Sequence, residues 1–182
     1  MRPLIAAAFL LLLCASAPAQ LTIPNVPLTD QNGHAVRFYD DLVKGRLVVV
    51  NFIFTSCTTV CSPMGANFAA LQQRLGDRAG VTLVSVSIDP SVDTPSRLKA
   101  WSERFGAKPG WTLLTGKPND VIELLKAMRV YTPDRISHAP IALVGNGATG
   151  QWERVSGLLA PDKIAGVIDT LRTTHNSGAA AR

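Results

Sequence analysis

The chain has 182 residues, is 47% hydrophobic and carries a formal net charge of +5, which suits one domain with a substantial core. Lys and Arg are scattered and form no run of five or six residues. The composition therefore does not favour a nucleic-acid partner or an anionic membrane. We expect a solvated basic surface, with docking on an acidic partner protein as the alternative.

Residues 1–19 have the pattern of a cleavable secretory signal peptide. Arg2 provides the positive start, residues 4–14 are apolar, and residues 17–19 are small, so Gln20 is the expected mature N-terminus. A retained membrane anchor is less favoured because a spanning helix needs about 20 apolar residues. Lipidation of Cys14 is disfavoured by the bulky Leu13 before it. We expect a periplasmic or exported protein without a stable membrane span.

The mature chain, residues 20–172, alternates strand and helix patterns, and residues 173–182 are expected to be a disordered tail. Asn32-Gly33 predicts an N-terminal hairpin. Predicted strands cover residues 47–54, 81–88, 111–114, 141–144 and 151–156. Predicted helices begin near Pro63, at Asp93 or Thr94, at Asn119 or Asp120, and at Pro161 or Asp162. This order predicts an α/β protein with a thioredoxin-like fold, in which helices flank a central mixed sheet that carries an N-terminal hairpin extension.

Cys57 and Cys61 lie between the first core strand and the helix that contains Pro63. The carboxyl ends of parallel strands are where open α/β sheets place their sites. A helix N-terminus stabilises a thiolate, so we expect a lowered pKa for at least one thiol. After export the pair is a disulfide, a dithiol that a partner keeps reduced, or a pair of metal ligands. An inert disulfide would close a small ring and stabilise the fold little.

The chain has three histidines, of which His34 and His175 lie in polar segments and are expected on the surface. His138 precedes the strand at residues 141–144, whose start lies beside the active-site loop in a thioredoxin-like sheet. Two thiolates and one imidazole suit copper, whereas zinc would require a fourth ligand. Asp89 and Asp93 occupy strand-end and helix-cap positions, so we expect them to be structural. Whether Pro140 follows a cis bond is left open.

Residues 51–61 and 85–95, together with His138 ahead of residues 141–144, resemble the SCO/SenC family of copper-binding, thioredoxin-like proteins. The resemblance implies that Cys57, Cys61 and His138 bind a copper ion, as Cu(I) or Cu(II). It also implies a role in assembling the dinuclear copper centre of cytochrome c oxidase. Two positions depart from the family pattern, because Ser62 stands where Pro is usual and Thr59 where many members have Asp.

Two functional hypotheses follow. In the first, the protein is an exported metallochaperone that passes copper to an accepting protein such as a cytochrome c oxidase subunit. In the second, it is a periplasmic thiol–disulfide oxidoreductase in which Cys57 and Cys61 form the redox-active pair. A thioredoxin-like reductant is a further expected partner. A peroxidase is less favoured, because no Arg is evidently placed to polarise a peroxide.

Overall fold

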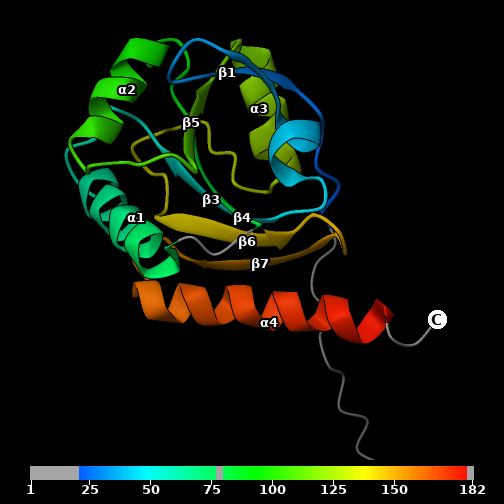
Figure 1. Ribbon diagram of the computed structural model, residues 1–182. Helices are drawn as coiled ribbons and strands as arrows, with labels where there is room; N and C mark the ends of the chain where they lie inside the picture. The colour runs from blue at the N-terminus through cyan, green and yellow to red at the C-terminus, as the bar shows by residue number, and fades with distance from the viewer. Residues whose placement is uncertain (1–20, 77–79, 180–182) are drawn as a thin grey trace, which may run out of the picture.

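A seven-stranded mixed sheet forms the centre of the computed structural model, which describes residues 21–76 and 80–179 (Figure 1). The predicted signal peptide lies outside these residues. The strand order is β2-β1-β5-β4-β3-β6-β7, in which β3, β4 and β5 are parallel and the other pairings are antiparallel. The strands are β1 (Pro27–Asp30), β2 (Ala35–Arg37), β3 (Leu47–Ile53), β4 (Val81–Ser87), β5 (Trp111–Thr115), β6 (Ile141–Asn146) and β7 (Gln151–Ser156).

Helices cover both faces of the sheet (Figure 1). They are the π-helical turn η1 (Phe38–Val43), α1 (Cys61–Leu75), α2 (Pro95–Glu103), α3 (Pro118–Ala127) and α4 (Pro161–Ala179). Every residue of β3 is buried, as its apolar sequence predicts. Since side chains alternate along a strand, Val49 and Ile53 pack with α1, α2 and α4, whereas Val50 and Phe52 pack with η1 and α3. The thioredoxin-like α/β prediction is confirmed.

Three helix boundaries differ from the sequence prediction. Helix α1 begins at Cys61, two residues before Pro63, so the second thiol belongs to its first turn. Helix α3 begins at Pro118 with Lys117 as N-cap, because a proline is preorganised for the first helical position. The backbone of α4 continues to Ala179, where a tail was expected from Thr173 onwards, since extending an existing helix costs less than starting one.

The topology brings three loops to one edge of the sheet. Strands β3 and β4 are parallel, so their carboxyl ends lie side by side. Strand β6 runs antiparallel to β3, with Ala142 opposite Asn51 near the end of β3. The segment that leads into β6 therefore lies beside the segment that follows β3. This edge holds the thiols, the segment after β4 and His138.

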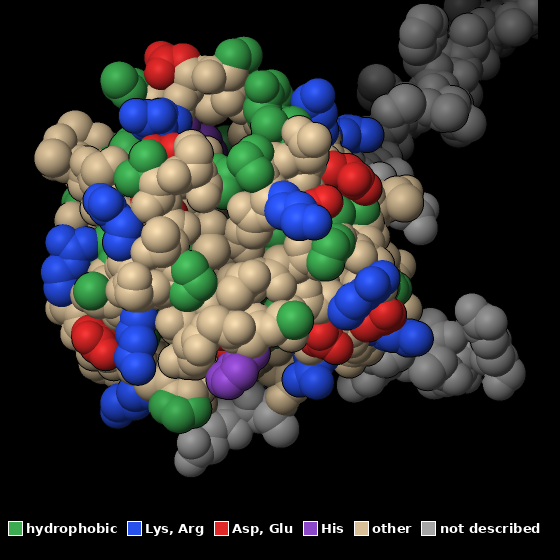
Figure 2. Space-filling view, turned by 90° about the horizontal axis from the view of Figure 1, so that it is seen from above, with side chains coloured by type: hydrophobic (Ala, Val, Ile, Leu, Met, Phe, Trp, Pro, Cys, Tyr) green, Lys and Arg blue, Asp and Glu red, His purple; other side chains and the backbone are tan. Residues whose placement is uncertain are grey.

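The surface carries dispersed charges. Figure 2 shows Lys and Arg side chains spread over the face that it presents, several of them beside Asp or Glu. Within the described residues, no helix combines the length and hydropathy needed to cross a membrane.

We predict that Ser85→Ala lowers the free energy of unfolding by about 1–3 kcal/mol. The buried Ser85 hydroxyl donates to Asn51 Oδ1 at 2.6 Å and accepts from Trp111 Nε1 at 2.9 Å, so it links three strands. Its removal leaves both partners without this hydrogen bond. Urea unfolding followed by circular dichroism measures the effect. Thr82→Ala, half-exposed on the same strand, is the control, and an equal loss in both variants would contradict the prediction.

Candidate metal centre

The two thiols lie at the junction of β3 and α1. The backbone N–H of Cys57 donates to the Phe54 carbonyl at 3.1 Å, which closes a turn directly after β3. The N–H of Cys61, at the start of α1, then donates to Cys57 Sγ at 3.4 Å. Both residues are free cysteines, with Cys57 half-buried and Cys61 only 1% exposed. A half-exposed sulfur thus receives a helix-terminal amide, while its neighbour lies in the core.

These surroundings separate the acidities of the two thiols. Burial opposes ionisation of Cys57, but hydrogen bonds from the Cys61 thiol, the backbone of Thr59 and the backbone of Cys61 outweigh it and lower the Cys57 pKa. Burial raises the pKa of Cys61 to about 12, and its hydrogen bond to Cys57 acts in the same direction. The expected lowered thiol pKa is therefore found at Cys57, while Cys61 holds its proton.

His138 lies on the segment between α3 and β6. Its side chain is 8% exposed, and its ring meets the Phe52 ring edge-on with centroids 6.2 Å apart. Burial lowers the His138 pKa, although a hydrogen bond to the backbone of Phe52 acts in the opposite direction. The Nε2 atom is buried without a hydrogen-bond partner. A neutral imidazole with one oriented and one unpartnered nitrogen is the form in which histidine binds metals.

The three predicted site residues line one pocket of about 290 Å³. Phe54, Val60 and Ile136 form apolar walls, and Arg135 adds a positively charged side chain. Across the described parts of the chain, no three His, Cys, Asp or Glu side chains are near enough to enclose a metal ion together. The fold therefore places the imidazole in the wall of the thiol pocket, but the three side chains are not close enough to bind one metal ion together. The predicted surface position of His34 is confirmed, since its side chain is 76% exposed.

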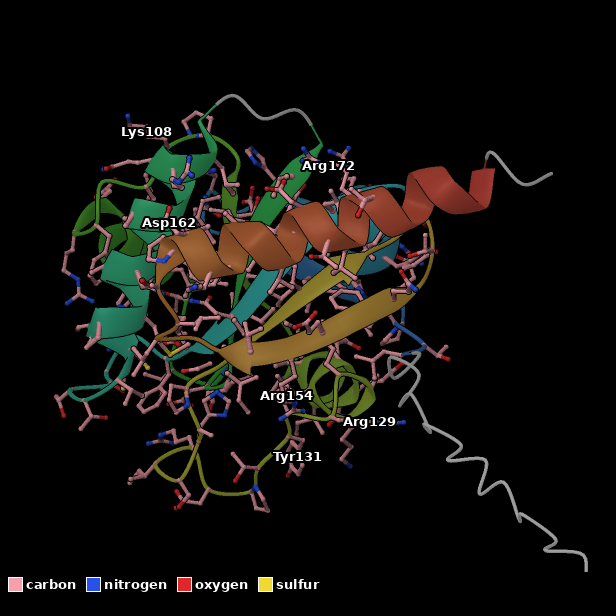
Figure 3. The ribbon with its side chains drawn as sticks, turned by 90° about the horizontal axis from the view of Figure 1, so that it is seen from below. Lys108, Arg129, Tyr131, Arg154, Asp162 and Arg172 are labelled. Atoms are coloured by element: carbon pink, nitrogen blue, oxygen red, sulfur yellow. The ribbon has the colours of Figure 1, made fainter. Side chains whose placement is uncertain are left out.

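The segment that carries His138 is a wall shared by two pockets. Arg135, Ile136 and His138 line the thiol pocket and also a second pocket of about 430 Å³, which Asp89 and Tyr131 border. Arg135 Nε lies 3.3 Å from the buried Asp89 carboxylate. Figure 3 shows Tyr131 where this segment leaves the end of α3. The bond before Pro140 is trans.

Sequence reasoning missed the role of this wall and of Asp93. We expected Asp93 or Thr94 to cap α2, and the structure assigns the cap to Thr94, whose Oγ1 accepts from the Arg97 N–H at 3.3 Å. The Asp93 carboxylate instead accepts hydrogen bonds from Thr55 in the thiol loop. The only signal in the sequence was that Asp93 follows the strand adjacent to β3.

Residues 15–168 match the sequence model of the SCO1/SenC family. The chain belongs to the SCO1/SenC family. A SCO1 protein homologue of Bacillus subtilis (strain 168) is 34% identical over 119 residues, which cover 62% of this chain and 62% of that protein. The chain thus matches less than two thirds of that relative's length.

Two solved structures extend the comparison. A SCO1/SenC family lipoprotein from Bacillus anthracis str. Ames is 28% identical, with a TM-score of 0.74 over 86% of this chain and 98% of that chain. Bradyrhizobium japonicum ScoI, solved with copper bound, is 24% identical, with a TM-score of 0.68 over 82% of this chain and 99% of that chain. The second likeness shows the SCO fold alone.

We predict that iodoacetamide modifies Cys57 of the reduced protein at least about tenfold faster than Cys61 at pH 7, because the thiolate is the nucleophile. In the chain from Gln20 onwards, which lacks Cys14, Cys57→Ser and Cys61→Ser each leave one thiol, and mass spectrometry follows its alkylation between pH 6 and 10. The rate in Cys61→Ser should level off at lower pH than that in Cys57→Ser. Equal rates in the two variants would contradict the assignment.

Proposed function

We propose that this SCO1/SenC protein is an exported copper carrier in which Cys57, Cys61 and His138 bind one copper ion. The observation that carries the proposal is the pocket that all three residues line. Two sulfurs and an imidazole form a donor set suited to copper. The buried Nε2 of His138, which lacks a partner, is the atom that a metal would satisfy.

The residues have distinct tasks in loading. The Cys57 thiol, with its lowered pKa, ionises first and presents the initial ligand. Cys61 must release a proton on binding, because its pKa of about 12 keeps it protonated near neutrality. The segment that carries Arg135 and His138 then moves toward the sulfurs, since the ligand set is not closed in the structure. His138 needs no deprotonation at neutral pH, because its pKa is lowered.

The physiological acceptor is proposed from the family. SCO proteins are associated with cytochrome c oxidase assembly, so we propose a copper-accepting subunit of that enzyme as the partner. The signal-peptide pattern of residues 1–19 supports export. A dithiol that holds a cargo ion transfers it when an acceptor supplies competing thiolates, and oxidation of the pair to a disulfide removes the ligands.

We predict that the reduced protein binds one copper ion per chain and that its disulfide form binds none. Cys57→Ala and Cys61→Ala should abolish tight binding, and His138→Ala should weaken it while disulfide formation persists. Anaerobic titration with cuprous and cupric ions measures this. His34→Ala, which changes an exposed histidine at the hairpin turn, is the matched control. Wild-type affinity in His138→Ala would remove the imidazole from the proposed site.

A second candidate function is supported by the acidities of the thiols. A half-exposed Cys57 with a lowered pKa next to a buried, protonated Cys61 is the arrangement of an attacking and a resolving thiol. The same variants separate the two functions. Turnover of a disulfide substrate that survives His138→Ala, in a protein that binds no copper, would support the oxidoreductase.

We predict that copper affinity rises about tenfold or more per pH unit near neutrality. Binding must displace at least the Cys61 proton, whose pKa of about 12 lies far above this range. Acid therefore weakens binding and alkali strengthens it. Competition titrations against a chelator of known pH dependence, between pH 6 and 8, measure the slope. An affinity independent of pH would mean that Cys61 is not a thiolate ligand.

A further inference from the structure

We propose that Asp93 is a positioning residue for the thiol pair, because its carboxylate fixes the turn that carries Cys57. This inference rests on the proposed function, since the geometry it maintains is that of two sulfur ligands. Asp93 lies beyond the end of β4 and is 1% exposed. No part of it is a proposed metal ligand.

The carboxylate holds Thr55 by both its backbone and its side chain. The Thr55 N–H donates to the two Asp93 oxygens at 3.1 and 3.2 Å, and the Thr55 hydroxyl donates to Oδ1 at 2.5 Å. Ser87, the last residue of β4, donates its hydroxyl to Oδ2 at 2.6 Å. One buried side chain therefore joins the loop after β3 to the end of β4.

Thr55 is two residues before Cys57, so this anchor acts directly on the thiol turn. The Cys57 N–H bonds back to Phe54, and the Cys61 N–H bonds to Cys57 Sγ. The first contact closes the turn, and the second joins the turn to α1. Asp93 adds the contact that fixes it to the sheet. Loss of that contact would let the Cys57 sulfur drift from Cys61 while both strands remain paired.

Capping of helix α2 does not explain the choice of a carboxylate at position 93. Helix α2 is already capped by Thr94, so Asp93 is not needed to begin it. A buried charge costs free energy unless several donors surround it, and here the backbone and the hydroxyl of Thr55 supply most of them. The buried oxygens of Asp93 accept hydrogen bonds from the thiol loop, so this residue supports the proposed sulfur ligands without binding the metal itself. Loss of a contact of this type weakens metal binding by about 10–100-fold.

Asp93→Asn and Thr55→Val test the proposal, with Ser87→Ala as the matched control. Asn keeps the size of the side chain but loses its charge, and Val keeps the shape of Thr55 but loses its hydroxyl. Ser87→Ala removes a hydrogen bond to the same carboxylate and one from the Asp89 N–H at 3.0 Å, and neither involves a residue of the thiol loop. If Asp93→Asn fails to fold, Thr55→Val carries the test, and Thr55→Ser, which keeps the hydroxyl, should restore wild-type behaviour.

Three readouts apply to the reduced full chain. The first is the copper dissociation constant, which we expect to rise about tenfold or more in Asp93→Asn and Thr55→Val and to change less than about twofold in Ser87→Ala. The second is the equilibrium constant for disulfide formation in glutathione buffers, which should shift in the same two variants. The third is amide exchange of Thr55, which should accelerate about tenfold or more in Asp93→Asn only. A double-mutant cycle of Asp93→Asn and Thr55→Val should be non-additive.

Wild-type values of all three quantities in Asp93→Asn, or equal changes in Ser87→Ala, would overturn the positioning role. Failure of the wild-type protein to bind copper would overturn the proposed function instead. In that case the glutathione equilibrium and the Thr55 exchange rate still decide whether Asp93 positions the thiols.

Discussion

The antiparallel pairing of β6 with β3 joins two parts of the site that are far apart in the sequence. Ala142 lies opposite Asn51, so the chain approaches β6 at the level where β3 ends. The ring of His138 then packs against Phe52, a residue of the strand that leads to the thiols. A one-residue shift of this register would change the position of the imidazole relative to the sulfurs, and it would also move every side chain of β6 to the opposite face of the sheet. The buried core thus protects the geometry of the site.

Burial acts differently on each of the three proposed ligands. It raises the pKa of Cys61 and lowers that of His138, so both are electrically neutral near pH 7. At Cys57 the amide and thiol of Cys61 offset burial and favour the anion. The three proposed ligands together therefore carry at most about one negative charge before a metal arrives. Apolar walls around such a pocket strengthen the attraction between that anion and a cation.

The sequence predicted the elements, and the meeting of the three candidate residues at one pocket, better than the contacts between side chains. The apolar run of β3, the prolines at helix starts and the turn at Asn32-Gly33 all carry local signals, so these features were predictable. The approach of His138 followed from topology. The bond between Asp93 and Thr55 spans 38 positions, and a helix-cap pattern explained the same aspartate equally well. The separation between His138 and the two thiols likewise depends on the packing of an irregular segment, which has no periodic pattern.

The wall formed by Arg135, Ile136 and His138 has a mechanical consequence. Because the same three residues border both pockets, a shift of the wall that narrows the thiol pocket would widen the pocket beside Tyr131. In the proposed carrier, movement of the imidazole toward the sulfurs would displace the wall that also carries Arg135, whose Nε lies 3.3 Å from the Asp89 carboxylate. That ion pair lies outside the proposed ligand set and its Arg135 side chain is 52% exposed, so added salt would weaken the attraction that holds the wall to the segment after β4.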